Sequence, residues 1–346
     1  MSSPTPPPSP PVSARRPNVG TMLPTDLVAW RDRALRVAPS AGDAYAIAVR
    51  ANAEREPAEP GYRLYWMTRG LLASAEVPAA STGHVVIGRH EKCDVVLDDE
   101  RAVSLRHVLV RSAVLDDGCP TLSVLDLRTH DGFELSDGTK QHAIMASGPV
   151  VFRIGSHTVV ALPSTGRIPE ALPSPLVERF ERDPGAGRGH EVKIQPAPAD
   201  RGPISRVTLM RGTIDLAERR SFPPGFTGEW SPDPAHPFEL LLTMGGFRAV
   251  VRFTVADLEQ GVLIGRAEKC VDAGLRPILA ESISRVHLLL VREKGQQFLY
   301  DTASTNGTEI DGRRVRCAPL ADEGTTARIA GKSGLSLHWR AVHALQ

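Results

Sequence analysis

The chain has 346 residues, a formal net charge of +1 at pH 7, and 23% charged residues. This length accommodates two ordinary domains, each with its own core. A charge near zero argues against nucleic acid or an anionic membrane as the main partner, because such surfaces attract strongly basic proteins. The sequence contains no apolar run near the ~20 residues that span a bilayer, and its first residues lack the apolar core of a signal peptide. We therefore expect no membrane span and a cytoplasmic location.

The sequence offers no recognisable catalytic or metal-binding pattern. The four cysteines (Cys93, Cys119, Cys270 and Cys317) are far apart and form no metal-ligand spacing, so we expect reduced thiols, no metal and no cofactor. The phosphate loop of nucleotide hydrolases, the zinc-protease HExxH, the GxSxG nucleophile elbow and the kinase motifs are also missing. These observations predict that the protein is not an enzyme. The segment 207–237, whose role the sequence does not define, leaves a hidden activity as an alternative.

The N-terminal part has little that could be buried. Residues 1–22 are rich in proline and serine, which predicts a disordered tail. Residues 23–58 predict a short helical segment with two helices. The first is Thr25–Val37, where apolar residues recur at helical spacing, and the second is the alanine-rich Asp43–Arg55.

Two later stretches have the texture of β-structure. Residues 60–163 and 204–346, the latter with a core at about 235–344, consist of short runs rich in β-branched and aromatic residues. Such close-set strands indicate antiparallel β-sandwiches rather than βαβ units, so the predicted fold class is all-β. Residues 164–203 have the composition of a Pro/Gly-rich linker, in which Pro175–Arg182 predicts a short helix.

The two strand-rich stretches repeat each other. Three short segments recur at an offset of about 175–180 residues: VIGRHEKC at 86–93 and LIGRAEKC at 263–270, SLRH at 104–107 and SRVH at 284–287, and DLRTHDG at 126–132 and DTASTNG at 301–307. A repeat of this length with small drifts in the offset indicates tandem domains with different loop lengths.

The second copy contains residues suited to binding an anion. Arg266 offers a planar fork of donors that matches phosphate oxygens and stays charged at physiological pH. Ser284 adds a hydroxyl donor from another loop, and Thr305 and Asn306 lie in a turn that Gly307 permits. Loops between the strands of a rigid sandwich are where binding residues usually lie.

The ordered series GR, SRVH and DTASTNGT, followed by Asp311-Gly312, resembles the forkhead-associated (FHA) domain. The resemblance implies an all-β sandwich that recognises phosphothreonine in extended peptides through loops at one end. It assigns phosphopeptide binding to Arg266, Ser284, Arg285, Thr305 and Asn306. It assigns the shaping of the loops to Gly265, His287 and Gly307, with His287 fixing the Ser284 loop from inside.

The first copy matches the pattern less well. It keeps the Gly-Arg pair, but its last loop has Asp131 where the family has asparagine. A carboxylate there lacks the amide donors and repels an incoming phosphate. Arg89, Ser104, Arg106 and His107 define a weaker second phosphate site, and the alternative for this copy is a structural role or a protein contact.

The function that the sequence predicts is a phosphothreonine-peptide-binding adaptor in Ser/Thr kinase signalling. Its partner is a phosphothreonine-containing protein, such as the kinase or its substrate, and the abundance of Ala, Gly, Pro and Arg suggests a bacterial source. The alternative is a constitutive scaffold, for instance in secretion or cell-envelope machinery. A further hypothesis is self-docking, in which a phosphorylated Thr5, Thr21 or Thr25 binds at the site of its own chain.

Overall fold

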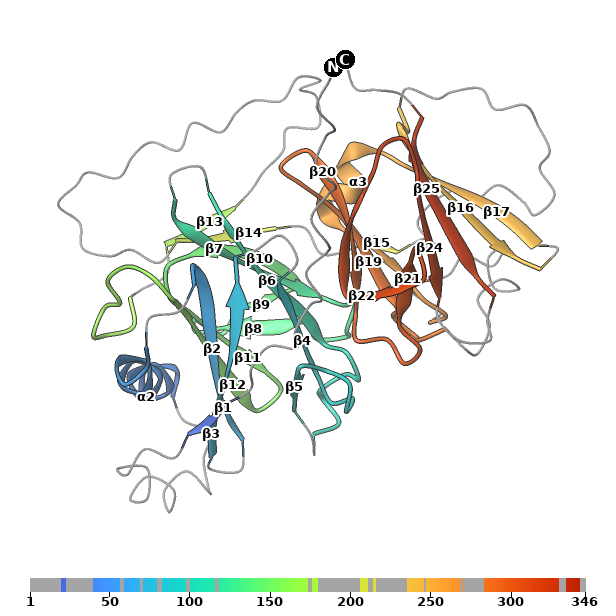
Figure 1. Cartoon of the computed structure of the whole chain (residues 1–346). Helices are drawn as coiled ribbons and strands as arrows, with labels where there is room; N and C mark the ends of the chain where they lie inside the picture. Colours follow the sequence, from blue (N-terminus) through green and yellow to red (C-terminus); the bar gives the residue numbers. More distant parts are fainter. Residues whose placement is uncertain are drawn as a thin grey trace, which may run out of the picture.

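A computed structural model describes the main part of the chain. The described residues are 20–22, 40–56, 59–68, 71–79, 83–97, 100–115, 118–173, 176–179, 206–210, 214–215, 235–245, 247–267, 270, 283–329 and 334–342. They form two β-rich domains side by side and two helices, α2 (Ala41–Ala53) and α3 (Val255–Gln260) (Figure 1). No helix in these ranges has the length and apolar character needed to cross a membrane.

The N-terminal domain is a sandwich of two sheets. Its strands are β1 (Gly20–Met22), β2 (Gly61–Thr68), β3 (Leu71–Pro78), β4 (His84–Gly88), β5 (Val95–Val96), β6 (Val108–Val114), β7 (Pro120–Asp126), β8 (Phe133–Leu135), β9 (Lys140–Gln141), β10 (Ala143–Ser147), β11 (Val150–Ile154), β12 (His157–Pro163), β13 (Leu176–Arg179) and β14 (Arg206–Leu209). One sheet has the order β1-β3-β2-β12-β11-β8-β9, and the other has the order β13-β14-β10-β7-β6-β4-β5.

The C-terminal domain has the same plan with fewer edge strands. Its strands are β15 (Ile214–Asp215), β16 (Phe238–Met244), β17 (Phe247–Phe253), β18 (Val262–Ile264), β19 (Leu288–Glu293), β20 (Gln296–Asp301), β21 (Thr308–Ile310), β22 (Arg313–Val315), β23 (Cys317–Leu320), β24 (Thr325–Ile329) and β25 (Ser336–Ala341). Its sheets have the orders β15-β18-β19-β20-β23 and β17-β16-β25-β24-β21-β22. The all-β fold class predicted from the sequence is confirmed.

The strand orders of the two domains correspond. In one sheet of each domain, β3-β2-β12-β11-β8-β9 and β17-β16-β25-β24-β21-β22 have the same spatial order relative to their order along the chain. In the other sheet, β10-β7-β6-β4 corresponds to β23-β20-β19-β18 in the same way. The repeat seen in the sequence is therefore accompanied by the same sheet topology in both halves.

Helix α2 covers the outer face of one N-terminal sheet. Its alanine-rich sequence has high helix propensity, and the Ser40 side chain caps its first turn by accepting a hydrogen bond from Asp43 N at 3.1 Å. Tyr45 and the helix alanines pack against Tyr65 and Val160 of β2 and β12. The helix predicted at Asp43–Arg55 is thus present with slightly different ends.

The sheet that contains β4, β6 and β7 is apolar on both faces. Because side chains alternate along a strand, Val108 and Val110 of β6 face the core of their own sandwich, while Leu109 faces outward. Leu109 is fully buried nevertheless, since it belongs to the same apolar cluster as the core of the C-terminal domain, together with Val86 and Leu125 on the neighbouring strands. The two domains therefore share a continuous hydrophobic core.

The chain between the sandwiches is built into both of them. Strand β14 pairs with β10 of the N-terminal domain, and β15 pairs with β18 of the C-terminal domain. Residues 206–209, which the sequence assigned to the second domain, thus belong to the N-terminal sheet. The predicted helix at Pro175–Arg182 is wrong, because Leu176–Arg179 forms β13 beside β14. A free sheet edge overrides the weak helix preference of so short a segment.

The predicted tail also needs one correction. Gly20–Met22, at its end, forms β1 antiparallel to β3, with Thr21 opposite Ala73. The rest of the tail and the predicted helix Thr25–Val37 lie outside the described residues.

Candidate functional site

The predicted site residues of the C-terminal domain lie on two loops at one edge of a sheet. Ile264, Leu288 and Asp301 are register partners at the ends of the adjacent strands β18, β19 and β20. The β18–β19 loop, with Arg266 and Ser284, and the β20–β21 loop therefore leave the sheet at the same edge. This topology brings together residues that are far apart in the sequence.

The two ends of the β18–β19 loop are hydrogen-bonded to each other. Arg266 N donates to Ser284 O at 3.1 Å, and Ala267 N donates to Arg285 O at 3.0 Å. A Cβ atom on Gly265 would overlap the Arg285 carbonyl oxygen. Only glycine permits this close approach of the backbones, so the glycine of the GR pair serves to position Arg266 next to Ser284.

His287 fixes both loops from inside the domain, as the resemblance implies. Its Nδ1 accepts a hydrogen bond from Ser284 N at 3.2 Å, which leaves Nε2 to donate to Gly307 O at 3.3 Å. The ring is fully buried, and burial lowers the pKa of His287. The imidazole is therefore neutral and acts as a structural crosslink.

Asp301 organises the β20–β21 loop. Its carboxylate accepts hydrogen bonds from Ser304 N and Ser304 Oγ, both at 2.7 Å, and from Thr308 Oγ1 at 2.8 Å. The Ser304 hydroxyl in turn accepts from Gly307 N at 2.9 Å, and Gly307 adopts φ +84°. These local bonds close a tight turn that presents Thr305 and Asn306 at its tip.

Ser284 joins the two loops. Its Oγ accepts a hydrogen bond from Thr305 N at 2.9 Å and lies 3.4 Å from Thr305 Oγ1. Arg266, Arg285 and Thr305 are exposed, and within the described residues neither guanidinium has a hydrogen-bond or ion-pair partner. The loop edge thus combines two uncompensated guanidinium groups with a hydroxyl, which is a donor set suited to a phosphate dianion.

The N-terminal domain has the same loop scaffold. Arg89 N donates to Ser104 O at 3.1 Å, Ser104 N donates to His107 Nδ1 at 3.1 Å, and His107 Nε2 bonds Gly132 O at 2.7 Å. Thr129 takes the place of Ser304 and bonds Asp126 through its hydroxyl at 2.6 Å. The scaffold of the loops is therefore present in both domains.

The tip of the N-terminal loop differs in charge. His130 and Asp131 replace Thr305 and Asn306, and the Asp131 carboxylate pairs with Lys140 at 2.9 Å. Hydrogen bonding to Lys140 lowers the pKa of Asp131, so this carboxylate is ionised at neutral pH. Lys140 offsets part of this negative charge, and the weaker phosphate site of the N-terminal domain stays a prediction.

Three N-terminal side chains contact the β20–β21 loop of the C-terminal domain. His84 Nε2 bonds Asp301 O at 3.2 Å, Arg106 Nε and Nη2 donate to Ala303 O at 3.0 and 2.6 Å, and Lys92 Nζ donates to Thr305 O. Every second carbonyl of the segment 301–305 thus accepts from the other domain. We refer to His84, Lys92 and Arg106 as the interdomain clamp.

Arg106 does not lie where the sequence predicted it. The sequence grouped it with Arg89 in the weaker N-terminal site, yet all of its described hydrogen bonds cross to the C-terminal domain, including a 3.5 Å contact from Nη2 to Ser284 Oγ. In the repeat, Arg106 occupies the position of the buried Val286, and Leu105 occupies that of the exposed Arg285, so the cation of the first copy lies one residue later than that of the second.

Polar contacts hold the rest of the interface. Asp94 pairs with Arg316 at 2.5 Å, and Arg111 pairs with Glu293 and lies over the Tyr300 ring at 6.0 Å. Lys294 Nζ also donates to Val114 O at 2.6 Å. Both domains therefore contribute to a fixed arrangement around the loops.

The motifs in the sequence do not single out Lys92, His84 or Arg314. Arg314 lies directly over Gly307, where its guanidinium occupies the space of a Cβ atom, so it adds a third exposed cation near the loop tip. Its position after Asp311-Gly312 in a hairpin was the available signal. For Lys92 and His84, the sequence holds no signal of a contact with residues more than two hundred positions away.

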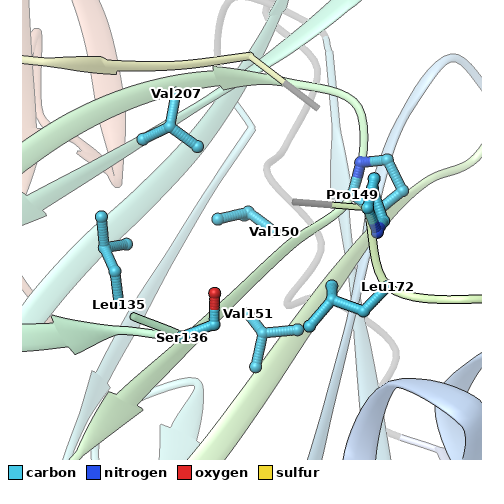
Figure 2. Close-up of a pocket in the computed structure, with 8 residues that line it drawn as sticks. Leu135, Ser136, Pro149, Val150, Val151, Leu172 and Val207 are labelled. Carbon is cyan, nitrogen blue, oxygen red and sulfur yellow. The ribbon is translucent and has the colours of Figure 1, made fainter. Parts of the chain in front are cut away.

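A small apolar pocket lies elsewhere, in the N-terminal domain (Figure 2). It is lined by Leu135, Ser136, Pro149, Val150, Val151, Leu172, Pro173 and Val207. Only Ser136 among them has a polar side chain, so the pocket offers apolar surface and no titratable group. In the described part of the chain, no cluster of His, Cys, Asp or Glu is arranged to hold a metal.

Residues 262–325 match the FHA domain family, and this match spans both loops. No curated protein matches the chain. Solved structures that are similar include FHA-1 of Rv1747 from Mycobacterium tuberculosis, with 24% identity over 31% of this chain and 99% of that one (TM-score 0.24). The FHA domain of CT664 from Chlamydia trachomatis has 18% identity over 31% and 98% (TM-score 0.25), and the FhaA FHA domain, complexed with the intracellular domain of Rv3910, has 19% over 29% and 98% (TM-score 0.23).

Proposed function

We propose that this chain, which carries an FHA domain at residues 262–325, is an adaptor that binds a phosphothreonine segment of a partner protein through the Arg266, Ser284 and Thr305 loops. The observation that carries the proposal is the Ser284–Thr305 contact, because it joins the loop with the exposed Arg266 and Arg285 to the tip of the other loop. A phosphothreonine has about two negative charges and three acceptor oxygens, which this donor set can satisfy.

Each residue has a separate role in this proposal. Arg266 and Ser284 hold the phosphate, and Arg285 lines its rim. Asn306, at the tip of the loop, bonds the backbone of the peptide beside the phosphothreonine, since an amide can both donate and accept. His287 and Asp301 keep the two loops in register through the bonds described above.

We further propose that the adaptor acts in Ser/Thr kinase signalling in the cytoplasm. The partner would be the kinase itself or one of its substrates. The self-docking hypothesis uses the same site: Thr21 lies in β1, while Thr5 and Thr25 lie outside the described residues.

Binding of a degenerate phosphothreonine peptide library to the full chain tests the proposal. The full chain is needed because the two domains share a hydrophobic core and because β14 belongs to the N-terminal sheet. Arg266→Ala removes a charge-assisted donor and should weaken binding by about tenfold or more, and the unphosphorylated library should not bind. Arg101→Ala, at an exposed arginine of the N-terminal domain, serves as the charge-matched control.

The competing function is a constitutive scaffold. The ionised Asp131 at the tip of the N-terminal loop favours it for that domain, because a carboxylate there opposes phosphate. If the folded wild-type chain binds no phosphopeptide, and if partner capture survives phosphatase treatment, the scaffold is the better explanation.

A further inference from the structure

The phosphate site of the C-terminal domain has a buried cation beside it that comes from the other domain. Arg106 is only 6% exposed, and its Nη2 lies 3.5 Å from Ser284 Oγ. Its described partners are a carbonyl oxygen and a hydroxyl; the Asp301 carboxylate is near enough to attract it electrostatically, but no described carboxylate lies within ion-pairing distance of the guanidinium. A buried charge normally has an anionic partner, because leaving it uncompensated is costly.

The position of Arg106 identifies the anion that could compensate it. A phosphate oxygen bonded to Ser284 Oγ would lie within a few ångströms of the Arg106 guanidinium. At this distance, in surroundings that largely exclude water, the attraction between opposite charges is much stronger than at an exposed surface. Burial lowers the pKa of Arg106, but an arginine stays protonated at neutral pH.

The interdomain clamp also controls the shape of the β20–β21 loop. Bonds from His84, Arg106 and Lys92 hold the carbonyls of Asp301, Ala303 and Thr305 on one side, while the Asp301 carboxylate and Ser284 hold the loop on the other. The loop is therefore preorganised by both domains. A preformed site loses less conformational entropy on binding.

We propose that the phosphothreonine site is shared between the two domains: Arg106 of the N-terminal domain supplies a further guanidinium to the phosphate held at Arg266 and Ser284. This inference rests on the proposed function. It gives the N-terminal domain a part in phosphopeptide recognition that does not need a phosphate site of its own. Arg106 interacts with the phosphate, whereas His84 and Lys92 act as positioning residues through the loop carbonyls.

The test compares full-length wild type with Arg106→Gln, Arg106→Lys and Arg101→Gln. The glutamine removes the charge but retains an N–H donor, and the lysine keeps the charge. Arg101 is exposed and lies on the same β5–β6 loop as Arg106. Arg101→Gln therefore removes an equal charge from the same loop and serves as the matched control.

Two quantities are measured: the affinity for a phosphothreonine peptide selected from the library, and the pKa of its bound phosphate from the pH dependence of the phosphorus-31 chemical shift. A neighbouring cation stabilises the dianion and so lowers the phosphate pKa from its ordinary value of about 6. We expect Arg106→Gln to weaken binding by about tenfold and to raise the pKa of the bound phosphate by about one unit. Arg106→Lys should keep the wild-type phosphate pKa, and Arg101→Gln should change neither quantity.

The outcomes separate this inference from the function on which it rests. If Arg266→Ala abolishes binding while Arg106→Gln binds as wild type does, the shared site is refuted and the phosphothreonine adaptor stands. Weaker binding by Arg106→Gln with an unchanged phosphate pKa also refutes it, because Arg106 would then only hold the loop. If wild type binds no phosphopeptide, the proposed function itself fails.

Discussion

The shared core between the domains can be tested at Leu109, on the outer face of the N-terminal sheet. This side chain is fully buried in the cluster that includes the core of the C-terminal domain. Replacing it with alanine removes roughly three methylene equivalents, or about 2.4 kcal/mol of transfer free energy, and leaves a cavity that adds to the loss. We expect Leu109→Ala to lower the free energy of unfolding by about 3 kcal/mol.

The informative result is how this loss of stability is divided between the two domains. Hydrogen exchange of the full chain, followed by mass spectrometry, should show faster exchange in β6 and β7 and also in β19 and β20 of the other domain. Val110→Ala is the matched control, because Val110 is the next residue on β6 and is equally buried but faces the core of its own sandwich. Its effect should be concentrated in the N-terminal domain. If Leu109→Ala leaves exchange in the C-terminal domain at the wild-type rate, the two domains do not stabilise each other.

Two further predictions concern single side chains. Ser284→Ala removes the acceptor of Thr305 N and a donor to phosphate. It should therefore lower the free energy of unfolding by about 1–2 kcal/mol and phosphopeptide affinity by about tenfold. Calorimetry measures both quantities, and an equal loss of affinity in Ser104→Ala would contradict the assignment of the phosphate site to the C-terminal domain. Burial lowers the pKa of His84 to about 4, so the unfolded chain binds a proton that the folded protein does not between pH 6.5 and about 4. The free energy of unfolding should therefore fall as the pH drops through this window. His84→Gln should reduce this fall by up to about 3 kcal/mol, as measured by urea unfolding at a series of pH values. An unchanged pH dependence would show that His84 does not contribute.

The turn 301–307 could be predicted from the sequence because its contacts are local. Asp301, Ser304 and Gly307 interact at separations of three residues, and glycine is needed at 265 and 307 for steric reasons that hold in any loop of this shape. That Thr305 meets Ser284, 21 residues away, was implied by the resemblance of the ordered series to the FHA domain. The same reasoning identified the altered charge at Asp131 in the first copy.

The segments between the domains could not be predicted in the same way. Strands β13 and β14 are short, and each forms because a neighbouring edge accepts its backbone hydrogen bonds. A pattern within four residues carries no information about such an edge. The sequence therefore suggested a helix where the structure has β13, and it assigned β14 to the second domain rather than to the N-terminal sheet.

The sequence carried only part of the information about the contact between the domains. Continuous apolar runs at Val85–Ile87 and Val108–Val110 are typical of a sheet covered on both faces, but they do not identify what covers the outer face. Likewise, the sequence shows that Arg106 is present and charged. The direction in which the Arg106 side chain points depends on which face of its loop meets the other domain.

Short-range spacing and backbone sterics are enough to predict the two sandwiches, their repeat and the local geometry of the turn 301–307. The shared core of the two domains, and the contacts of His84, Lys92 and Arg106 with the loop 301–305, became visible only in the folded structure. Contacts across about two hundred residues depend on how two folded surfaces pack against each other, and no local pattern encodes that packing.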